Sequence, residues 1–169
     1  IAELATLLAQ QGHTITVMYP QSKDCPTKNW VANDTLEKQQ VQKKPIPAWY
    51  IAPLRYSFPN IFQLLRETRE IFRTHDRVHI WEYYYPISVI PLLYALCTGQ
   101  RQKVILTTDG FVGYSYKPKE PRWLVPAFKL YTLGVARWLF KIPPTVTTYG
   151  KILLPYGRKA GVPSHKLRV

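Results

Sequence analysis

Apolar side chains recur at helical spacing at the start of the chain, where one face would carry Ile1, Leu4, Ala5, Leu8 and Ala9. Gly12 follows where a helix would end, so the pattern predicts a helix over residues 1–11. Residues 13–19 (HTITVMY) alternate in polarity and are rich in β-branched side chains. They predict a strand that stops at Pro20.

The pattern changes twice in the middle of the chain. Residues 21–48 are polar, lysine-rich and nearly free of periodicity, which predicts a long surface excursion. Asn60 precedes an apolar stripe that predicts a helix through Arg73, with the asparagine side chain as its cap. Residues 77–81 (RVHIW) then predict a short strand.

Helices and strands alternate through the rest of the chain. The predicted helices cover residues 87–98, 121–140 and 151–160, and the predicted strands cover residues 104–107, 145–148 and 166–169. Such alternation is typical of an α/β fold with a doubly wound, mostly parallel sheet and helices on both faces. We therefore expect residues 1–169 to form one Rossmann-like domain.

The charge of the chain restricts its partners. Twenty-three Lys and Arg residues against ten Asp and Glu residues give a formal net charge of +13, which favours phosphates, nucleic acid or an acidic lipid surface. Two cysteines and four histidines without a short ligand spacing make a structural metal site a poor interpretation, and no metal or cofactor is expected. Residues 83–100 are uncharged, but Pro86 and Pro91 argue against a bilayer-spanning helix.

Four segments in order resemble the amino-terminal domain of glycosyltransferase family 4. They are ELATLLAQQGHTITVMYP, RVHIWEYYYP, VILTTDGFVGYSY and TVTTYGKILLPYGRKAGVPSHKLRV. The resemblance implies one half of a GT-B architecture, with its first strand and its carboxyl-terminal, donor-binding domain outside this chain. It further implies metal-independent, retaining transfer from a nucleotide-sugar to a sugar or lipid-linked acceptor. It also implies peripheral attachment to a membrane and an acceptor-side half that transfers no sugar alone. The two cysteines without a short spacing favour a reducing, cytoplasmic setting.

Two acidic residues follow predicted strands directly. Glu82 follows RVHIW and Asp109 follows VILT, so both are expected at the edge of the sheet where α/β folds bind ligands. Asp109 is the candidate catalytic base for an acceptor hydroxyl, although the family commonly has histidine at this place. The alternatives are a solvated or ion-paired turn for Glu82 and a cap before Gly110 for Asp109.

Candidate acceptor-binding residues surround the two acids. The resemblance and the loop chemistry favour Glu82, Tyr83, Tyr84, Gly110, Gly113 and Tyr114. Backbone amides of the glycine loop would approach a phosphate or sugar, and tyrosine offers an apolar face with a polar tip. Packing against the next helix is the alternative for at least one tyrosine, and an ordinary flexible loop is the alternative for the glycines.

The predicted helix 121–140 mixes aromatic and basic residues. Its candidate membrane contacts are Trp123, Lys129, Arg137, Trp138 and Phe140. The alternative is a helix buried within the protein. The whole chain has two alternative functions. One is a dinucleotide-binding domain, whose glycine fingerprint is absent, and the other is a basic nucleic-acid- or membrane-binding module without catalysis, for which no nucleic-acid motif is found.

Overall fold

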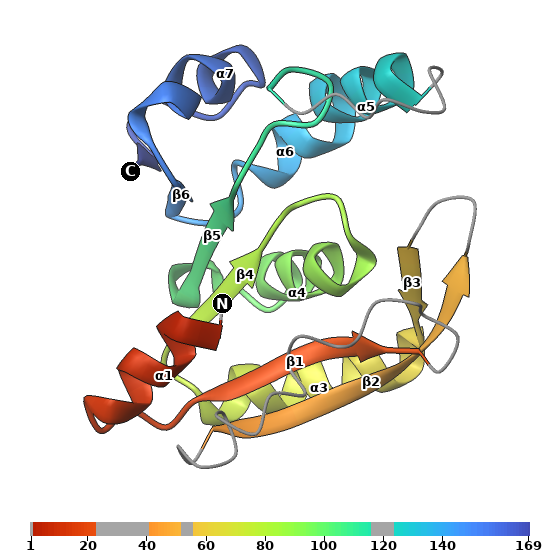
Figure 1. Cartoon of the computed structure of the whole chain (residues 1–169), viewed down its shortest axis with the longest axis vertical. Helices are drawn as coiled ribbons and strands as arrows, with labels where there is room; N and C mark the ends of the chain where they lie inside the picture. Colours follow the sequence, from red (N-terminus) through yellow and green to blue (C-terminus); the bar gives the residue numbers. More distant parts are fainter. Residues whose placement is uncertain (1, 23–40, 52–55, 116–123) are drawn as a thin grey trace. The chain divides into compact units, whose positions relative to one another are not determined.

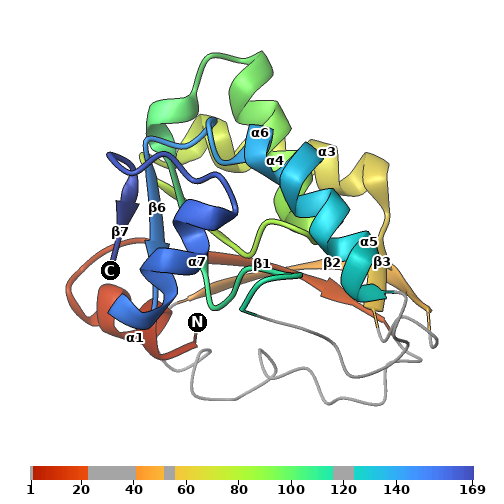
Figure 2. The same cartoon turned by 90° about the horizontal axis from the view of Figure 1, so that it is seen from above.

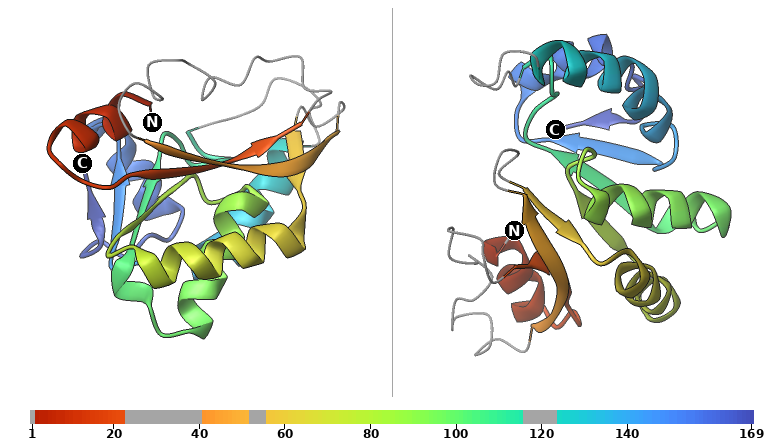
Figure 3. Two further views of the ribbon diagram at one scale, coloured as in Figure 1. Left: turned by 90° about the horizontal axis from the view of Figure 1, so that it is seen from below. Right: turned by 90° about the vertical axis from the view of Figure 1, so that its right-hand side faces the viewer.

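The computed structural model describes residues 2–22, 41–51, 56–115 and 124–169 (Figure 1). The chain divides into two compact units, residues 1–64 and residues 65–169. The first unit contains helix α1 (Ala2–Gln10) and strands β1 (Thr16–Gln21), β2 (Gln42–Ile51) and β3 (Tyr56–Pro59). Strand β2 is parallel to β1, beside which it lies in Figure 3, and antiparallel to β3.

Prolines inside β1 and β2 explain two wrong predictions in this unit. Pro20 lies within β1, which is an edge strand, and residues 42–48 of the predicted excursion belong to β2. Residues 42–47 of β2 pair only with β1, and residues 48–51 pair only with β3. Pro45 and Pro47 therefore direct their missing N–H groups toward the unpaired side, where no ladder bond is lost. The earlier part of the predicted excursion, residues 23–40, lies outside the described residues.

Helix α3 (Ile61–Thr74) begins as its sequence predicts and runs across the boundary between the two units. The side-chain Oδ1 of Asn60 accepts a hydrogen bond from the backbone N–H of Gln63 at 3.1 Å. The backbone O of Asn60 accepts the N–H of Leu64 at 2.9 Å. The predicted asparagine cap is therefore confirmed, because it satisfies one of the donors that a helix start leaves unpaired.

The second unit is built on a parallel sheet. Its strands β4 (Val78–Trp81), β5 (Val104–Thr108), β6 (Thr145–Thr148) and β7 (Leu167–Arg168) lie side by side in chain order. Helix α4 (Pro86–Cys97) and a 3-10 turn at Arg101–Lys103 connect β4 to β5. The α/β fold with a parallel sheet is thereby confirmed, and each of the five strands and helices named here lies close to its predicted position.

One long helical segment connects β5 to β6. It consists of α5 (Leu124–Tyr131), a π-helical turn (Thr132–Ala136) and α6 (Arg137–Leu139), which form a single rod in Figure 2. A 3-10 turn (Lys151–Leu153) and α7 (Leu154–Lys159) connect β6 to β7. These elements correspond to the predicted helices 121–140 and 151–160, except that residues 121–123 lie outside the described residues.

The core of the second unit forms on one face of the parallel sheet. Ile80, Leu106 and Val146 are paired neighbours on β4, β5 and β6, and all three are buried on that face. The helices contribute Leu92 of α4 and Leu139 of α6 to the same cluster. Because the core fixes these strands and helices, it also fixes the loops that follow the strands at their carboxyl ends.

Replacing Asn60 tests whether its side chain stabilises helix α3. Asn60→Ala removes the acceptor for the Gln63 N–H and should lower the free energy of unfolding by about 1 kcal/mol. Asn60→Asp retains a capping oxygen, so its free energy of unfolding should remain close to that of the wild type. Urea denaturation of both variants checks this expectation, and equal stability of Asn60→Ala and wild type would contradict it.

Candidate functional site

The carboxyl ends of β4 and β5 bring the two predicted acids together. Trp81 and Thr107 are paired neighbours in the parallel ladder, and the next residue of β4, Glu82, donates its N–H to Thr107 O at 2.8 Å. The backbone N–H of Asp109 donates to Glu82 Oε1 at 2.9 Å. The expectation that both acids share one edge of the sheet is confirmed, since adjacent parallel strands end at the same edge.

Glu82 adopts a backbone conformation that side chains usually avoid. Its φ is +63°, in the left-handed region, which costs a non-glycine residue about 1–2 kcal/mol. The side chain is only 4% exposed. A buried acid in this conformation is retained only where surrounding bonds hold it, and such outliers are concentrated at functional sites. The alternative of a solvated turn residue is therefore wrong for Glu82.

The Thr108 hydroxyl connects the Glu82 carboxyl group to the loop after β5. Its Oγ1 is 2.8 Å from Glu82 Oε2 and 2.6 Å from the carbonyl O of Gly110. The hydroxyl carries one hydrogen, which it donates to one of these two oxygens at a time. It also accepts the N–H of Gly110 at 3.2 Å, so Thr108 holds the loop beside Glu82.

Burial favours the neutral form of Glu82. Removal from water is the largest cause that raises the pKa of Glu82 to about 8, and the hydrogen bond between the Glu82 and Asp109 side chains acts in the same direction. The bonds from the Asp109 N–H and the Thr108 hydroxyl act in the opposite direction. The side chain of Asp109 is exposed, so this residue presents the carboxyl group that solutes can reach.

The adjacent tyrosines differ in their access to solvent. Tyr83 is fully buried, and its hydroxyl accepts the N–H of Val112 at 2.8 Å, so its predicted contact with an acceptor is wrong. Tyr84 is half-buried. Burial raises the pKa of the Tyr84 hydroxyl, and the charge of Glu82 is the second cause, which places this ring beside the acid pair. Tyr84 therefore remains a candidate contact for an acceptor.

Sequence reasoning missed one residue at this edge. Tyr149 follows β6 directly, is exposed, and has its ring centroid 5.3 Å from that of Trp81. The pKa of its hydroxyl is raised first by burial and then by Asp109 and Glu82. The sequence could have predicted this position, because Tyr149 comes after the strand TVTT just as Glu82 and Asp109 come after their own strands.

The loop after β5 is packed, and its amides are already bonded. The N–H groups of Gly110, Phe111 and Val112 donate to Thr108 Oγ1, Ser115 Oγ and Tyr83 Oη respectively. Gly110, Phe111, Val112 and Gly113 are buried. The predicted cradle of free amides at Gly110 is therefore wrong, because the loop uses these donors to order itself.

Packing against helix α5 explains why Gly113 must be glycine. Its φ is +83°, and a Cβ at this position would lie 2.7 Å from the backbone N and Cα of Lys129. A side chain would collide with rigid helix backbone. Tyr114 is half-buried and lies under Lys129, whose Nζ is 6.0 Å from the ring centroid. The two residues thus attach the loop to α5, and Tyr114 keeps a partly accessible ring.

The α5–α6 segment presents apolar and basic side chains to solvent. Lys129, Arg137 and Trp138 are exposed, as expected, and the exposed large apolar residues also include Leu130, Leu133 and Val135. Phe140 is fully buried against Tyr83, with ring centroids 4.7 Å apart, so its predicted membrane contact is wrong. Trp123 lies outside the described residues. None of the helices that the structure describes combines the length and the apolar character needed to cross a bilayer.

Within the described residues, no group of three or more His, Cys, Asp or Glu side chains could hold a metal ion. A scan against protein-family models finds no match to the chain, and a search of curated proteins finds no match either. The site thus consists of a buried carboxyl group, an exposed acid whose backbone N–H is bonded to it, and the tyrosines Tyr84 and Tyr149.

The protonation of Glu82 predicts how stability changes with pH. The ordinary pKa of 4.5 applies to the unfolded chain, and the folded value is about 8. Between these values the unfolded chain releases the proton while the folded chain retains it, so stability should fall as pH rises, by at most about 1.4 kcal/mol per unit.

Glu82→Gln should flatten this fall, because glutamine is close in shape to the protonated acid and does not titrate. Urea denaturation at pH 5, 6.5 and 8 measures the effect. Glu3→Gln, at an exposed position of α1, is the matched control and should keep the wild-type slope. A wild-type stability that rises across this window relative to Glu82→Gln would mean that Glu82 is ionised in the folded protein.

Proposed function

We propose that this chain is the acceptor-side domain of a glycosyltransferase that moves a sugar from a nucleotide-sugar to an acceptor hydroxyl. The observation that carries the proposal is the bonded pair of Glu82 and Asp109 at the carboxyl edge of a parallel sheet. Ligands of open α/β sheets bind at this edge. The order and spacing of the four sequence segments that resemble glycosyltransferase family 4 add support.

The two acids would have different tasks. Asp109 has an exposed carboxylate that can accept the proton of an attacking hydroxyl. Glu82 is a positioning residue, since its Oε1 accepts the Asp109 N–H and its other oxygen is occupied by Thr108. A neutral Glu82 adds no second negative charge beside Asp109, so the proton-accepting group can be held close to it without repulsion.

Aromatic rings beside the acids would hold the acceptor. Tyr84 lies two residues after Glu82 in the chain, and the Tyr149 ring lies beside that of Trp81, the residue before Glu82, with ring centroids 5.3 Å apart. Tyrosine rings offer an apolar face to a sugar ring or a lipid chain and a hydroxyl for hydrogen bonding. We assign the acceptor to this edge and the nucleotide-sugar to a second domain, with metal-independent, retaining transfer as the reaction type that the resemblance implies.

Asp109→Asn in the complete enzyme tests the catalytic assignment. The change preserves size and removes the proton acceptor, so turnover should fall by about 10²- to 10⁴-fold while donor affinity and melting temperature stay nearly constant. Asp76→Asn is the matched control, because Asp76 is an exposed residue that precedes β4 at the other end of the strand.

Near-normal turnover of Asp109→Asn would remove Asp109 from the catalytic role, since asparagine caps a turn about as well as aspartate. A complete protein that binds no nucleotide-sugar and transfers none would remove the proposed function itself. Residues 1–169 alone should transfer no sugar, because only one of the two substrates would be positioned.

The exposed face of α5–α6 supports an anionic membrane surface as a partner. Leu130 is 74% exposed and Trp138 is 47% exposed, with Lys129, Arg137 and Lys141 nearby on the same segment. Apolar side chains would enter the headgroup boundary while the lysines and arginine meet lipid phosphates. A lipid-linked acceptor and a cytoplasmic, peripheral location fit this arrangement.

A double substitution tests this attachment. Leu130→Ala with Trp138→Ala should reduce co-flotation with vesicles that contain phosphatidylserine, and added salt should weaken wild-type binding by screening the cations. Phe62→Ala is the matched control, because Phe62 is an exposed aromatic residue of α3, far along the chain from this segment. Unchanged flotation of the double variant would show that this face does not contact the membrane.

A further inference from the structure

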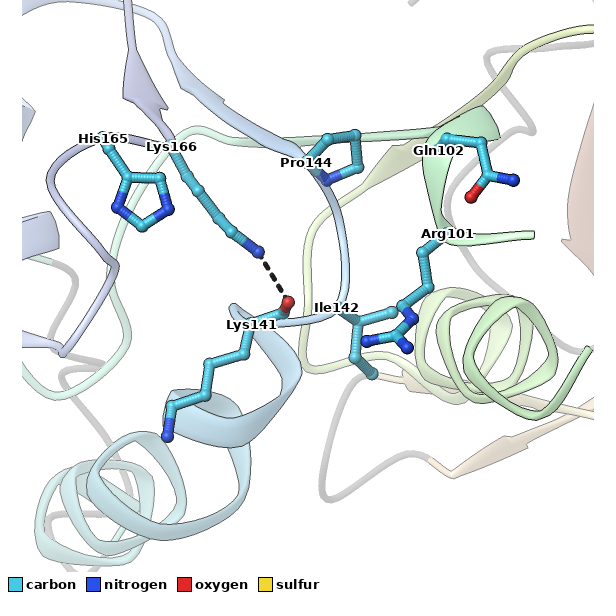
Figure 4. A pocket seen from close by; sticks show the side chains of 7 residues that line it. All are labelled: Arg101, Gln102, Lys141, Ile142, Pro144, His165 and Lys166. Carbon is cyan, nitrogen blue, oxygen red and sulfur yellow. Dashed lines mark hydrogen bonds between the residues drawn. The ribbon is translucent and has the colours of Figure 1, made fainter. Parts of the chain in front are cut away.

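The amino edge of the parallel sheet carries a groove that the proposed function does not use. Its volume is about 450 Å³, and it is lined by Arg101, Gln102, Lys141, Ile142, Pro144, His165 and Lys166 (Figure 4). These residues belong to the segments that lead into β5, β6 and β7. The groove therefore lies at the opposite ends of the strands from Glu82 and Asp109, entirely within the second unit.

The charges of this basic groove are of one sign. Arg101, Lys141 and Lys166 are cations, His165 adds an imidazole, and no carboxylate is among the lining residues. In the part of the chain that the structure describes, none of these three cations forms an ion pair with an acid. In Figure 4 the Lys141 side chain points away from the other cations, whereas Arg101 and Lys166 are close enough for the charge of Arg101 to lower the pKa of Lys166. Two such cations without a counter-charge repel one another, and a bound anion would relieve that repulsion.

Lys166 shows that the positive charge is fixed in place. Its Nζ donates to the carbonyl O of Lys141 at 2.6 Å and of Pro143 at 2.9 Å, and Figure 4 shows the first of these bonds. The ammonium has three hydrogens, so one remains for a ligand. Burial lowers the pKa of Lys166, and the nearby charge of Arg101 is the second cause, as expected for neighbouring cations with no acid between them.

The arrangement matches a phosphate group better than a carboxylate. A guanidinium offers paired donors that fit phosphate oxygens, and an ammonium and an imidazole add donors from other directions. Ile142 and Pro144 supply an apolar wall for the organic part of a small phosphoester. We propose that the basic groove is a binding site for a phosphate monoester, separate from the acceptor edge and independent of the proposed function.

A titration of residues 1–169 with inorganic phosphate, followed by amide chemical shifts, tests this proposal. Shifts should be concentrated at Arg101, Lys141, His165 and Lys166. Arg101→Gln should raise the dissociation constant by about tenfold or more, as for the loss of one charge-assisted hydrogen bond. Arg69→Gln, an exposed α3 residue outside the groove, removes the same charge and is the matched control.

Lys141→Gln provides a second variant, because the Lys141 side chain is exposed while its backbone carbonyl, which Lys166 contacts, is unchanged. Because the Lys141 ammonium points away from Arg101 and Lys166 in Figure 4, a folded Lys141→Gln protein should lose less affinity for phosphate than Arg101→Gln does. The proposal is overturned if phosphate shifts are spread over the surface, or if Arg69→Gln weakens binding as much as Arg101→Gln does.

A parallel experiment distinguishes the source of the phosphate. Flotation with phosphatidylcholine vesicles, with and without phosphatidic acid, is measured for wild type and Arg101→Gln. A loss of phosphatidic-acid-dependent binding in Arg101→Gln identifies a lipid headgroup as the ligand. Equal flotation of the two proteins, together with weakened phosphate binding by Arg101→Gln in the titration, identifies a soluble phosphoester.

Discussion

The hydrogen bonds of the Glu82 carboxyl group join the ends of β4 and β5, and the geometry of the candidate site depends on them. One oxygen holds the Asp109 N–H and the other contacts the Thr108 hydroxyl, which also contacts Gly110. Hydrogen bonds of this kind contribute about 0.5–1.5 kcal/mol each, enough together to offset the left-handed backbone of Glu82. The hydrogen bonds of the buried acid thus hold the turn in place despite the unfavourable φ of Glu82.

The two edges of the parallel sheet have opposite chemistry. The carboxyl edge carries a buried acid, an exposed acid and tyrosines, while the amino edge carries cations, of which Lys166 contacts backbone carbonyls of the segment after α6. Although the net charge of the chain is +13, the two edges of this sheet therefore carry charges of opposite sign. Anions would be attracted to the amino edge and not to the carboxyl edge.

Most of the strand and helix positions of the second unit were predictable, because glycines and prolines such as Gly99, Pro144 and Gly161 mark where one element stops and the next begins. The meeting of Glu82 and Asp109 was predictable for the same reason. The burial of Tyr83 and Phe140 was not, since three consecutive tyrosines and an aromatic helix end give no periodic signal of which ring faces the core. The bonded amides of the loop at Gly110 depend on Ser115 and Tyr83, contacts that spacing along the chain does not reveal.

Strand β2 was not predicted because its prolines are typical of a loop. The placement of these prolines also affects how the protein can associate with other molecules. On the side of β2 away from β1, Pro45 and Pro47 present carbon atoms where other residues would present N–H donors. A strand from a second molecule would find acceptors there without alternating donors, and a ladder needs both. The segment thereby resists edge-to-edge growth into aggregates, even though it is extended and rich in hydrogen-bonding carbonyls.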